Sequence, residues 1–234
     1  MFAGPNGSGK TTVKNGLPSK LFEVYVNPDD IEKEIRDEGI LNLTPFGISL
    51  STDEIRESFT SSELLKTHRL TEAASDIECR HGVIDFRGLA MNSYFASVLS
   101  DTLRRKLLNE SISFSFETVM SSPDKVQFLC DAQRRGFRTY LYYVATSDPA
   151  INVERVKYRV SDGGHGVPAE KIVARYHRSL ALVREAIRYT NRAFFFDTTG
   201  ERSWHFAEIT NGTLIDLKSD EMPEWFQTAV WDRF

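Results

Sequence analysis

Residues with the spacing of a phosphate-binding loop lie at the start of the chain, in the stretch AGPNGSGKTT. Gly4, Gly9, Lys10 and Thr11 fit the P-loop (Walker A) pattern G-x-x-x-x-G-K-[ST]. The glycines let the backbone curl so that successive N–H groups point inward at a phosphate, and the helix that follows adds its positive N-terminal end. Lys10 is expected to reach the β- and γ-phosphates, and the Thr11 hydroxyl to ligate Mg²⁺.

The nucleotide-binding set predicted from this loop is Gly4, Asn6, Gly7, Ser8, Gly9, Lys10, Thr11 and Thr12. The alternative is a surface turn that matches by accident, which we estimate at roughly one chance in a hundred for a chain of this length. The loop continues as KTTVKNGL, a short helical pattern that ends at Gly16. This context favours nucleotide binding.

A strand should precede such a loop, yet only Met1, Phe2 and Ala3 come before Gly4. Strands usually run about five or six residues. The strand before a P-loop is central in a parallel sheet, so both of its faces should be apolar. Either the start of the chain is assigned too late and apolar residues lie upstream, which we favour, or the strand is very short and holds the loop less rigidly.

Two acidic positions follow predicted strands, at the sheet edge where ligands bind in open α/β folds. Asp29 comes after the predicted strand 21–26 and could take the proton from a substrate hydroxyl; alternatively, it only stabilises the dipole of the helix that begins there. Glu117 and Thr118 end the predicted strand 111–119. They could bind a substrate hydroxyl or a water of Mg²⁺, or they could be a polar strand end that meets solvent.

Arginines flank a glycine-rich segment later in the chain. Arg155 and Arg159 share one helix face, Arg175 and Arg178 lie on the next helix, and the loop 162–168 between the helices is predicted to be a mobile lid. Guanidinium groups suit the neutralisation of a γ-phosphate during transfer. The alternative is that these arginines face solvent and pair with neighbouring glutamates.

Two other residues have structural explanations of at least equal weight. His165, inside the predicted lid, is better explained by hydrogen bonding to the backbone than by catalysis. Asp197 ends RAFFFD and resembles the acid of a Walker B strand, but a plain core strand explains it equally well. The sequence has no N-K-x-D guanine motif, no LSGGQ signature and no H-R-D catalytic loop.

The composition narrows the class of protein. The 234 residues are 41% apolar and 26% charged, as expected of a globular domain, and the net charge of −4 argues against a general nucleic-acid binder. Cys79 and Cys130 have no metal-ligand spacing and indicate reduced, cytoplasmic thiols. There is no apolar run of membrane-spanning length and no signal peptide, so we do not expect a membrane as a partner, and the net charge leads us to expect no nucleic acid.

Strand and helix patterns alternate along the chain, which predicts an α/β fold with a mostly parallel sheet flanked by helices. Asn211-Gly212 predicts the turn of a C-terminal β-hairpin. The stretch 40–87 is too long for an ordinary connection and is predicted to be a helical insertion within a single domain, 1–234. The remaining predicted strands are 83–86, 137–145 and 192–197, and the main predicted helices are 27–39, 51–59, 64–82, 92–110, 122–136, 148–160, 169–189 and 223–234.

Taken in order, six stretches resemble the zeta-toxin-like P-loop kinases, and within them the branch often labelled predicted ABC-type ATPase. The stretches are AGPNGSGKTT, VNPDDIEKEI, FSFETVMS, GFRTYLYYVAT, NVERVKYRVSDGGHGVP and IVARYHRSLALVREAI, and they cover nearly the whole chain. The resemblance implies a P-loop kinase fold, ATP and Mg²⁺ as cofactors, and phosphorylation of a hydroxyl of a sugar nucleotide such as UDP-N-acetylglucosamine or of another small metabolite. It also implies a possible antitoxin protein as a partner.

Carried over by motif, the family's catalytic aspartate falls on Asp29 and its γ-phosphate arginine on Arg155. Its acid at the end of the next strand falls on Glu117, with Thr118 beside it. The second arginine is assigned to Arg159, with Arg175 as the alternative, because SDGGHGVP differs from the well-known toxins.

The sequence thus predicts a cytoplasmic small-molecule kinase whose catalytic residues are Asp29, Lys10, Arg155 and Arg159. The insertion 40–87 departs from the well-known toxins, which affects the sugar-nucleotide assignment more than phosphoryl transfer. Two other hypotheses remain open at this stage. One is a regulatory or DNA-repair-like ATPase without a small acceptor, and the other is an inactive toxin remnant that has lost its first strand.

Overall fold

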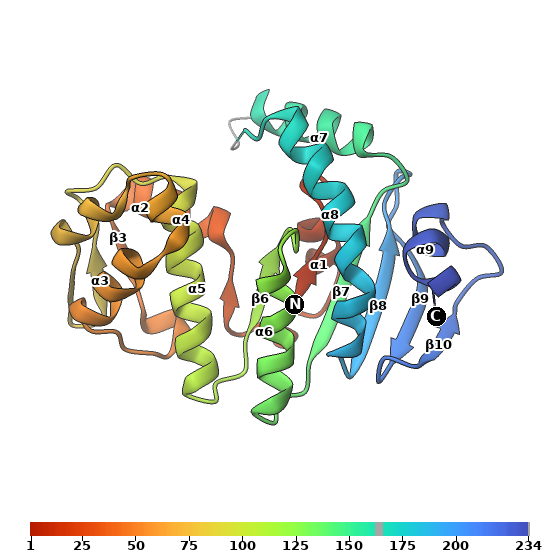
Figure 1. Cartoon of the computed structure of the whole chain (residues 1–234), viewed down its shortest axis with the longest axis horizontal. Coiled ribbons are helices and arrows are strands. Elements are labelled where there is room, and N and C mark those ends of the chain that lie inside the picture. Colours follow the sequence, from red (N-terminus) through yellow and green to blue (C-terminus); the bar gives the residue numbers. More distant parts are fainter. Residues whose placement is uncertain (162–165, 234) are drawn as a thin grey trace. The chain divides into compact units, whose positions relative to one another are not determined.

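The computed structural model describes residues 1–161 and 166–233, which form two compact units (Figure 1). Unit 1 combines Met1–Leu21 with Glu117–Phe234, and unit 2 is Phe22–Phe116. The described part is mixed α/β with a mostly parallel sheet flanked by helices, so the predicted fold class is confirmed. Within the described ranges, no helix has both the length and the apolar character that crossing a bilayer demands.

The sheet of unit 1 has the order β10-β9-β8-β7-β1, followed by residues 117–118 of β6. The strands from β8 to β6 run parallel, whereas β9 and β10 form the predicted antiparallel hairpin. The strands are β1 (Phe2–Ala3), β6 (Ser115–Thr118), β7 (Tyr140–Ala145), β8 (Arg192–Asp197), β9 (Trp204–Thr210) and β10 (Leu214–Leu217). The helices are α1 (Lys10–Asn15), α6 (Pro123–Arg134), α7 (Pro149–Ser161), α8 (Ala169–Arg188) and α9 (Glu224–Ala229). In Figure 1, α6 and α8 lie side by side over one face of this sheet.

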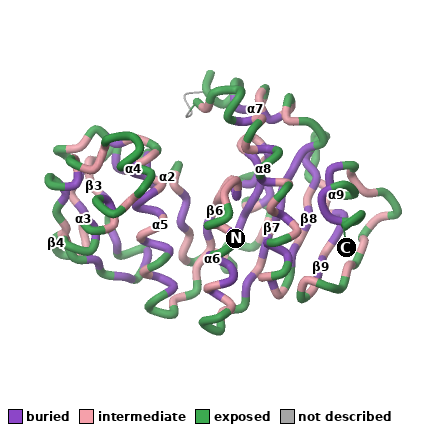
Figure 2. Tube along the Cα trace, in the orientation of Figure 1, coloured by how far each residue is buried: buried purple, intermediate pink, exposed green. Residues whose placement is uncertain are grey.

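The strand expected before the loop is β1, and it is central although it has two residues. Phe2 pairs in parallel with Glu117 of β6 on one side and with Tyr142 of β7 on the other. Both residues of β1 are fully buried, as Figure 2 shows by colour. The amine of Met1 donates to the Tyr140 carbonyl at 2.7 Å, and burial lowers the pKa of this amine to about 5.

Side chains alternate between the two faces of this sheet, as the pleat requires. On one face the rings of Phe2, Tyr142 and Phe194 stack in a row across three strands, with successive centroids 4.8 Å apart. On the other face Tyr143 reaches α8, where its hydroxyl lies 3.0 Å from that of Ser179. Stacking of Phe2 on Tyr142 thus adds to the ladder bonds that hold the short central strand.

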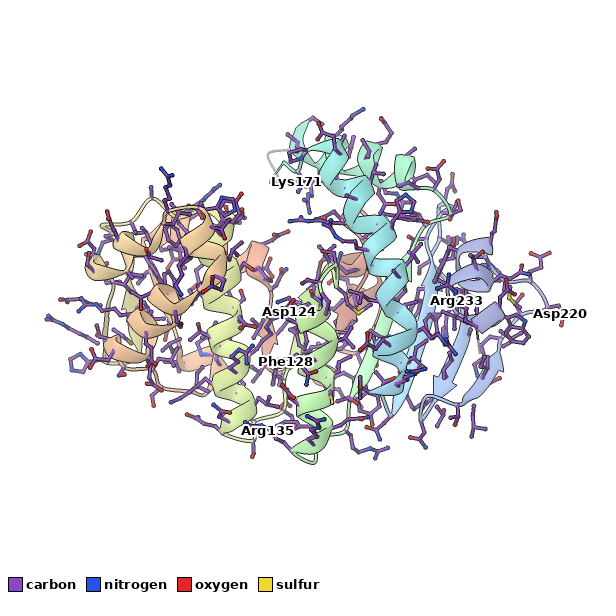
Figure 3. All side chains as sticks on the ribbon, viewed as in Figure 1. Asp124, Phe128, Arg135, Lys171, Asp220 and Arg233 are labelled. Atoms are coloured by element: carbon purple, nitrogen blue, oxygen red, sulfur yellow. The ribbon has the colours of Figure 1, made fainter. Side chains whose placement is uncertain are left out.

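Local signals in unit 1 gave the predicted turns and helix ends. Asn211 and Gly212 both have positive φ, 49° and 70°, which is the type I′ geometry of a tight hairpin. Helix α6 begins at Pro123, and Figure 3 shows Asp124 at its start and Arg135 at its end, where charges of these signs complement the helix dipole.

Unit 2 has α2 (Pro28–Glu38) and α5 (Ser93–Asn109) packed together, beside the short strand β2 (Tyr25–Val26). Strand β2 runs parallel to residues 115–116 of β6. The side chain of Asn27 accepts the Asp29 N–H at the start of α2, and Gly39 ends this helix with φ 73°, as predicted. A capping box formed by Ser51 and Glu54 is present at the start of α3 (Thr52–Ser61), within the predicted helix 51–59.

The segment 40–87, predicted to be a helical insertion with a strand at 83–86, has that strand and also two strands that were not predicted. Besides α3 and α4 (Glu63–Thr67), this segment forms a three-stranded antiparallel sheet in the order β3-β5-β4. The strands are β3 (Ile40–Asn42), β4 (Glu78–Arg80) and β5 (Val83–Asp85). The predicted helix 64–82 is interrupted because Arg69 and His81 have positive φ, 56° and 52°, and His81 forms with Gly82 the turn between β4 and β5.

Several predicted strands are shorter in the structure. The predicted strand 21–26 is reduced to Tyr25–Val26, because Leu21 belongs to a 3₁₀ turn and β2 has ladder partners only at residues 115–116. The predicted strand 111–119 forms only Ser115–Thr118, and 137–145 forms Tyr140–Ala145. Strand length follows the partner strand, which the local sequence does not reveal.

Candidate functional site

The glycine-rich loop joins β1 to α1 and adopts a conformation that needs glycine at three positions. Gly4, Gly7 and Gly9 have φ of 143°, 73° and 81°. A Cβ on Gly4 would lie 2.0 Å from the Val144 carbonyl oxygen, and one on Gly7 would lie 2.6 Å from the Asn152 carbonyl oxygen. Backbone therefore approaches the loop too closely for side chains at these two positions.

Two side chains from distant parts of unit 1 hold carbonyl groups of the loop. Nδ2 of Asn152, on α7, donates to the Asn6 carbonyl at 2.7 Å, and the hydroxyl of Thr198, after β8, donates to the Ser8 carbonyl at 2.7 Å. In a planar trans peptide the C=O and N–H groups point in opposite directions. The N–H groups of Gly7 and Gly9 belong to the same two peptides as these carbonyls. The bonds therefore direct these N–H groups away from Asn152 and Thr198, as a phosphate cradle requires.

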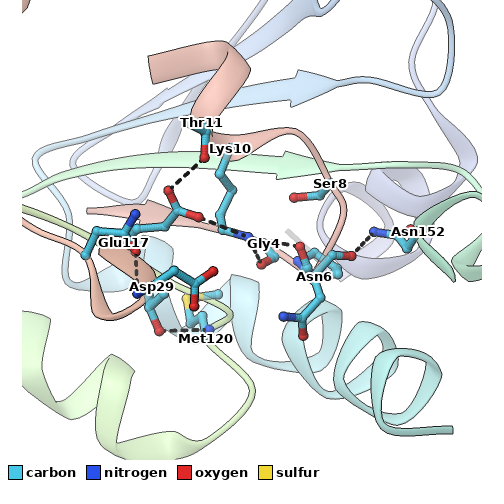
Figure 4. Close-up of polar contacts among 12 residues, drawn as sticks. Gly4, Asn6, Ser8, Lys10, Thr11, Asp29, Glu117, Met120 and Asn152 are labelled. Atoms are coloured by element: carbon cyan, nitrogen blue, oxygen red, sulfur yellow. Dashed lines mark hydrogen bonds and ion pairs between the residues drawn. The ribbon is translucent and has the colours of Figure 1, made fainter. Parts of the chain in front are cut away.

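The ammonium group of Lys10 lies over the loop itself. Nζ donates to the carbonyls of Gly4 and Pro5, each at 3.0 Å, and lies 3.7 Å from Oε1 of Glu117 (Figure 4). The Lys10 side chain is 7% exposed, so its charge is balanced by these oxygens rather than by bulk water. A phosphate in the loop would offer stronger, charged acceptors to the same ammonium.

Glu117 lies beside the start of α1 because β6 is the parallel neighbour of β1. The Thr11 hydroxyl donates to Oε2 of Glu117 at 3.4 Å. A hydroxyl and a carboxylate oxygen, completed by phosphate oxygens and water, form a donor set that suits Mg²⁺. Thr118 has a local role, because its hydroxyl accepts the Met120 N–H at 3.0 Å. Within the described ranges there is no cluster of three or more His, Cys, Asp or Glu side chains arranged to bind a metal on its own.

Two arginines reach the loop region from separate helices. Arg155 of α7 donates through one N–H to the Thr198 carbonyl at 2.5 Å and through another to the Thr198 hydroxyl at 3.3 Å. Arg175 of α8 donates to Oδ1 of Asn6 at 3.3 Å. The sequence placed Arg159 ahead of Arg175, but it is Arg175 that contacts the loop, whereas Arg159 is exposed on the last turn of α7.

The predicted lid is largely beyond what the structure describes. His165 and the rest of 162–165 lie outside the described residues, and 166–168 lead directly into α8. The role of this lid stays a prediction.

Asp29 belongs to unit 2, where it lies in the first turn of α2 with its N–H bound to the side chain of Asn27 at 3.1 Å. Its carboxylate and that of Asp30 are on exposed residues, which suits stabilisation of the helix dipole and equally leaves the group open to solutes. The role of Asp29 as a base stays a prediction.

The carboxylate of Asp197 makes hydrogen bonds that stabilise the fold. Its carboxylate accepts the indole N–H of Trp225 and the Thr199 N–H, each at 2.8 Å, and the residue is buried. These bonds attach α9 to the end of β8, which favours the plain alternative over a Walker B acid.

The sequence did not single out Asn152 or Thr198. Asn152 is three residues before Arg155 on the same helix and is fully buried, so its amide needs hydrogen-bond partners, but burial is not visible in the sequence. Thr198 follows the last parallel strand, so its place at the ligand edge could have been inferred from topology alone.

Comparison with known proteins supports the family assignment. A protein-family model described as Zeta toxin matches residues 89–200 of this chain. The matched stretch contains Glu117, Asn152, Arg155, Arg175 and Thr198, and it begins after the glycine-rich loop. The resemblance inferred from the motifs is confirmed over this part of the chain.

Crystal structures of AvrRxo1-ORF1 in complex with AvrRxo1-ORF2 show a similar fold. The structure with sulphate ions and the structure with ATP each give a TM-score of 0.56, at 13% and 14% sequence identity, and cover 93% of this chain and 60% of the compared chain. The PezAT chromosomal toxin–antitoxin system of Streptococcus pneumoniae gives a TM-score of 0.48 at 12% identity, covering all of this chain and 76% of that chain.

An uncharacterized protein of Haemophilus influenzae is 30% identical over 69 residues, which are 30% of this chain and 49% of that protein. This chain thus spans about half the length of the curated relative and 60% of the compared chains in the AvrRxo1-ORF1:-ORF2 complexes.

Proposed function

We propose that this chain is an ATP-dependent kinase of the zeta-toxin type, which transfers the γ-phosphoryl group of ATP to a hydroxyl group of a small molecule. The observation that carries the proposal is the arrangement around one glycine-rich loop of unit 1. An ammonium, a hydroxyl paired with a carboxylate and one guanidinium lie at this loop, and a second guanidinium is linked to it through Thr198. These are Lys10 and Thr11 of α1, Glu117 of β6, Arg155 of α7 and Arg175 of α8.

The residues of the loop bind the phosphates of ATP in this proposal. Lys10 exchanges its contacts with the Gly4 and Pro5 carbonyls for oxygens of the β- and γ-phosphates, while the loop amides donate to the same groups. Thr11 and Glu117 hold Mg²⁺, directly or through water, and the ion offsets the negative charge of the phosphates. The ATP bound in the AvrRxo1-ORF1:-ORF2 structure supports ATP as the nucleotide.

Arginine side chains stabilise the charge that shifts during transfer. Arg155 and Arg175 are both half-buried beside the loop, where a guanidinium interacts more strongly with phosphate than it does in bulk water. We therefore place Arg175 ahead of Arg159 as the second arginine. Asp29 is proposed as the base that accepts the proton of the acceptor hydroxyl, on the strength of the family motif.

The finer parts of the function are also proposals. The acceptor is a sugar nucleotide such as UDP-N-acetylglucosamine or another small metabolite, and the second protein in the AvrRxo1-ORF1:-ORF2 complexes supports an antitoxin-like partner for this chain. Both cysteines are free thiols, which supports the cytoplasm as the compartment.

The test is a transfer assay with γ-labelled ATP and Mg²⁺. The purified chain is incubated with UDP-N-acetylglucosamine or with a pooled metabolite extract, and new phosphorylated species are sought by mass spectrometry. We expect a labelled metabolite that disappears with Lys10→Ala, whereas Lys14→Ala in the last turn of α1 keeps it. Hydrolysis of ATP without any phosphorylated acceptor, stimulated by DNA or a protein, would favour the regulatory ATPase instead.

A further inference from the structure

We infer that Thr198 is a positioning residue whose hydroxyl couples the nucleotide loop to Arg155. The inference rests on the proposed function, because it assigns Thr198 a role in phosphoryl transfer. It goes beyond that function, because neither the loop pattern nor the arginine motif includes this residue.

The contacts of Thr198 all lie within unit 1. Its hydroxyl donates to the Ser8 carbonyl at 2.7 Å and accepts an N–H of Arg155 at 3.3 Å, while its own carbonyl accepts a second N–H of Arg155 at 2.5 Å. Its backbone N–H donates to Ala145 at the end of β7, at 3.0 Å. The side chain also packs against Gly9, since a Cβ there would lie 3.6 Å from the Thr198 methyl group.

A hydroxyl is suited to this position because it has one proton and two lone pairs. The oxygen lies 2.7 Å from the Ser8 carbonyl and 3.3 Å from the Ala145 carbonyl, so the proton is directed mainly toward the loop and the lone pairs accept from the guanidinium. A charged donor polarises the O–H group and strengthens the bond that it makes onward to the Ser8 carbonyl. Thr198 is 6% exposed, so water does not replace these bonds readily.

Both hydrogen-bond partners of the Thr198 hydroxyl, the Ser8 carbonyl and the Arg155 guanidinium, matter for phosphoryl transfer. The bond to the Ser8 carbonyl fixes the peptide between Ser8 and Gly9. The Gly9 N–H of this peptide points the opposite way, toward a bound phosphate. The two bonds from Arg155 fix the plane of its guanidinium group. Thr198 therefore positions two groups that act on the same phosphates, one through binding and the other through transition-state charge.

The test compares Thr198→Val, which keeps the shape and removes the hydroxyl, with Thr198→Ser, which keeps the hydroxyl. We expect Thr198→Val to raise the KM for ATP and to lower kcat, together about 10- to 100-fold in kcat/KM, as for loss of a hydrogen bond to a charged group. Thr198→Ser should restore most of both values. Thr199→Val is the matched control, because the Thr199 hydroxyl accepts the Ser147 N–H at 2.9 Å, and its kinetics should stay near wild type. Equal kinetics for wild type and Thr198→Val would overturn the inference.

A double-mutant cycle with Arg155→Ala separates the effect of Thr198 on the loop from its effect through Arg155. If Thr198 acts through Arg155, Thr198→Val should have little further effect on kcat in the Arg155→Ala background but should still raise the KM for ATP. Fully additive effects on kcat would contradict the coupling. The same cycle in urea unfolding of the nucleotide-free protein gives a coupling energy even when turnover is too slow to measure, and additive unfolding energies would likewise contradict it.

These experiments distinguish failure of the proposed kinase function from failure of the inference about Thr198. If the wild-type chain neither binds ATP by calorimetry nor phosphorylates any acceptor, the proposed function fails. If the wild type is active and Thr198→Val matches it, only the inference about Thr198 fails.

Discussion

The Thr11 hydroxyl donates a hydrogen bond to the Glu117 carboxylate at 3.4 Å, although 106 positions separate the two residues in the chain. This pair exists because β6 is the parallel neighbour of β1, which brings the end of one strand beside the helix that follows the other. It places the Glu117 carboxylate beside the glycine-rich loop, next to Lys10.

Glu117→Gln is expected to weaken the use of Mg²⁺. The amide keeps the shape of the side chain but lacks the negative charge that balances a divalent cation and the Lys10 ammonium. The Mg²⁺ concentration for half-maximal activity should rise about tenfold, which corresponds to roughly 1.4 kcal/mol. The measurement is a Mg²⁺ titration of the transfer rate. Glu154→Gln on the exposed face of α7, where Glu154 pairs with Lys157, should leave the titration unchanged.

Asn152→Asp is expected to loosen the loop. The change removes both N–H donors of a fully buried amide, so the Asn6 carbonyl loses its partner, and it buries a carboxylate charge for which the Thr146 hydroxyl is a donor. We expect a loss of roughly 1–3 kcal/mol in the free energy of unfolding and a weaker affinity for ATP, measured by urea unfolding and calorimetry. Gln227→Glu makes the same chemical change at an exposed position of α9 and should do neither. Wild-type affinity for ATP in Asn152→Asp would show that the loop does not depend on this amide.

Asp29→Ala separates the two explanations of the first turn of α2. If Asp29 is the base, kcat should fall about 10²- to 10⁴-fold while ATP binding stays near normal. Asp30→Ala is the matched control, because Asp30 occupies the same turn and stabilises the same dipole. Similar small losses for the two variants would identify a role in the helix dipole alone.

The buried amine of Met1 predicts a pH dependence for a chain that begins at this residue. Its pKa is about 5 in the folded state against 8.0 for the unfolded amine, so between these values the unfolded state binds more protons. The free energy of unfolding should therefore rise with pH across this window, by up to roughly 1.4 kcal/mol per pH unit from this group. Urea unfolding from pH 5 to 8 measures the slope. A variant extended by apolar residues before Met1 lacks this amine and should lose the contribution; an unchanged slope would contradict the assignment.

The sequence by itself determined the features that depend on neighbouring residues. The loop pattern from Gly4 to Thr11, the end of α1 at Gly16, the helix over 27–39 and the turn at Asn211-Gly212 were predicted from the sequence, and the structure has each of them. These features follow from positive φ, from side chains that bind nearby N–H groups and from residue spacing along a helix. Such causes act over a few residues, so they can be recognised without the fold.

Only the tertiary structure decided which distant residues lie against the glycine-rich loop. Asn152 and Thr198 bind loop carbonyls from 146 and 190 positions away, and Arg175 rather than Arg159 contacts Asn6. The same holds for strand lengths and for the antiparallel sheet in 40–87, because a strand extends only where a partner offers its N–H and C=O groups. These outcomes depend on which elements pack together, and a contact between residues far apart in the chain leaves no local pattern from which it can be predicted.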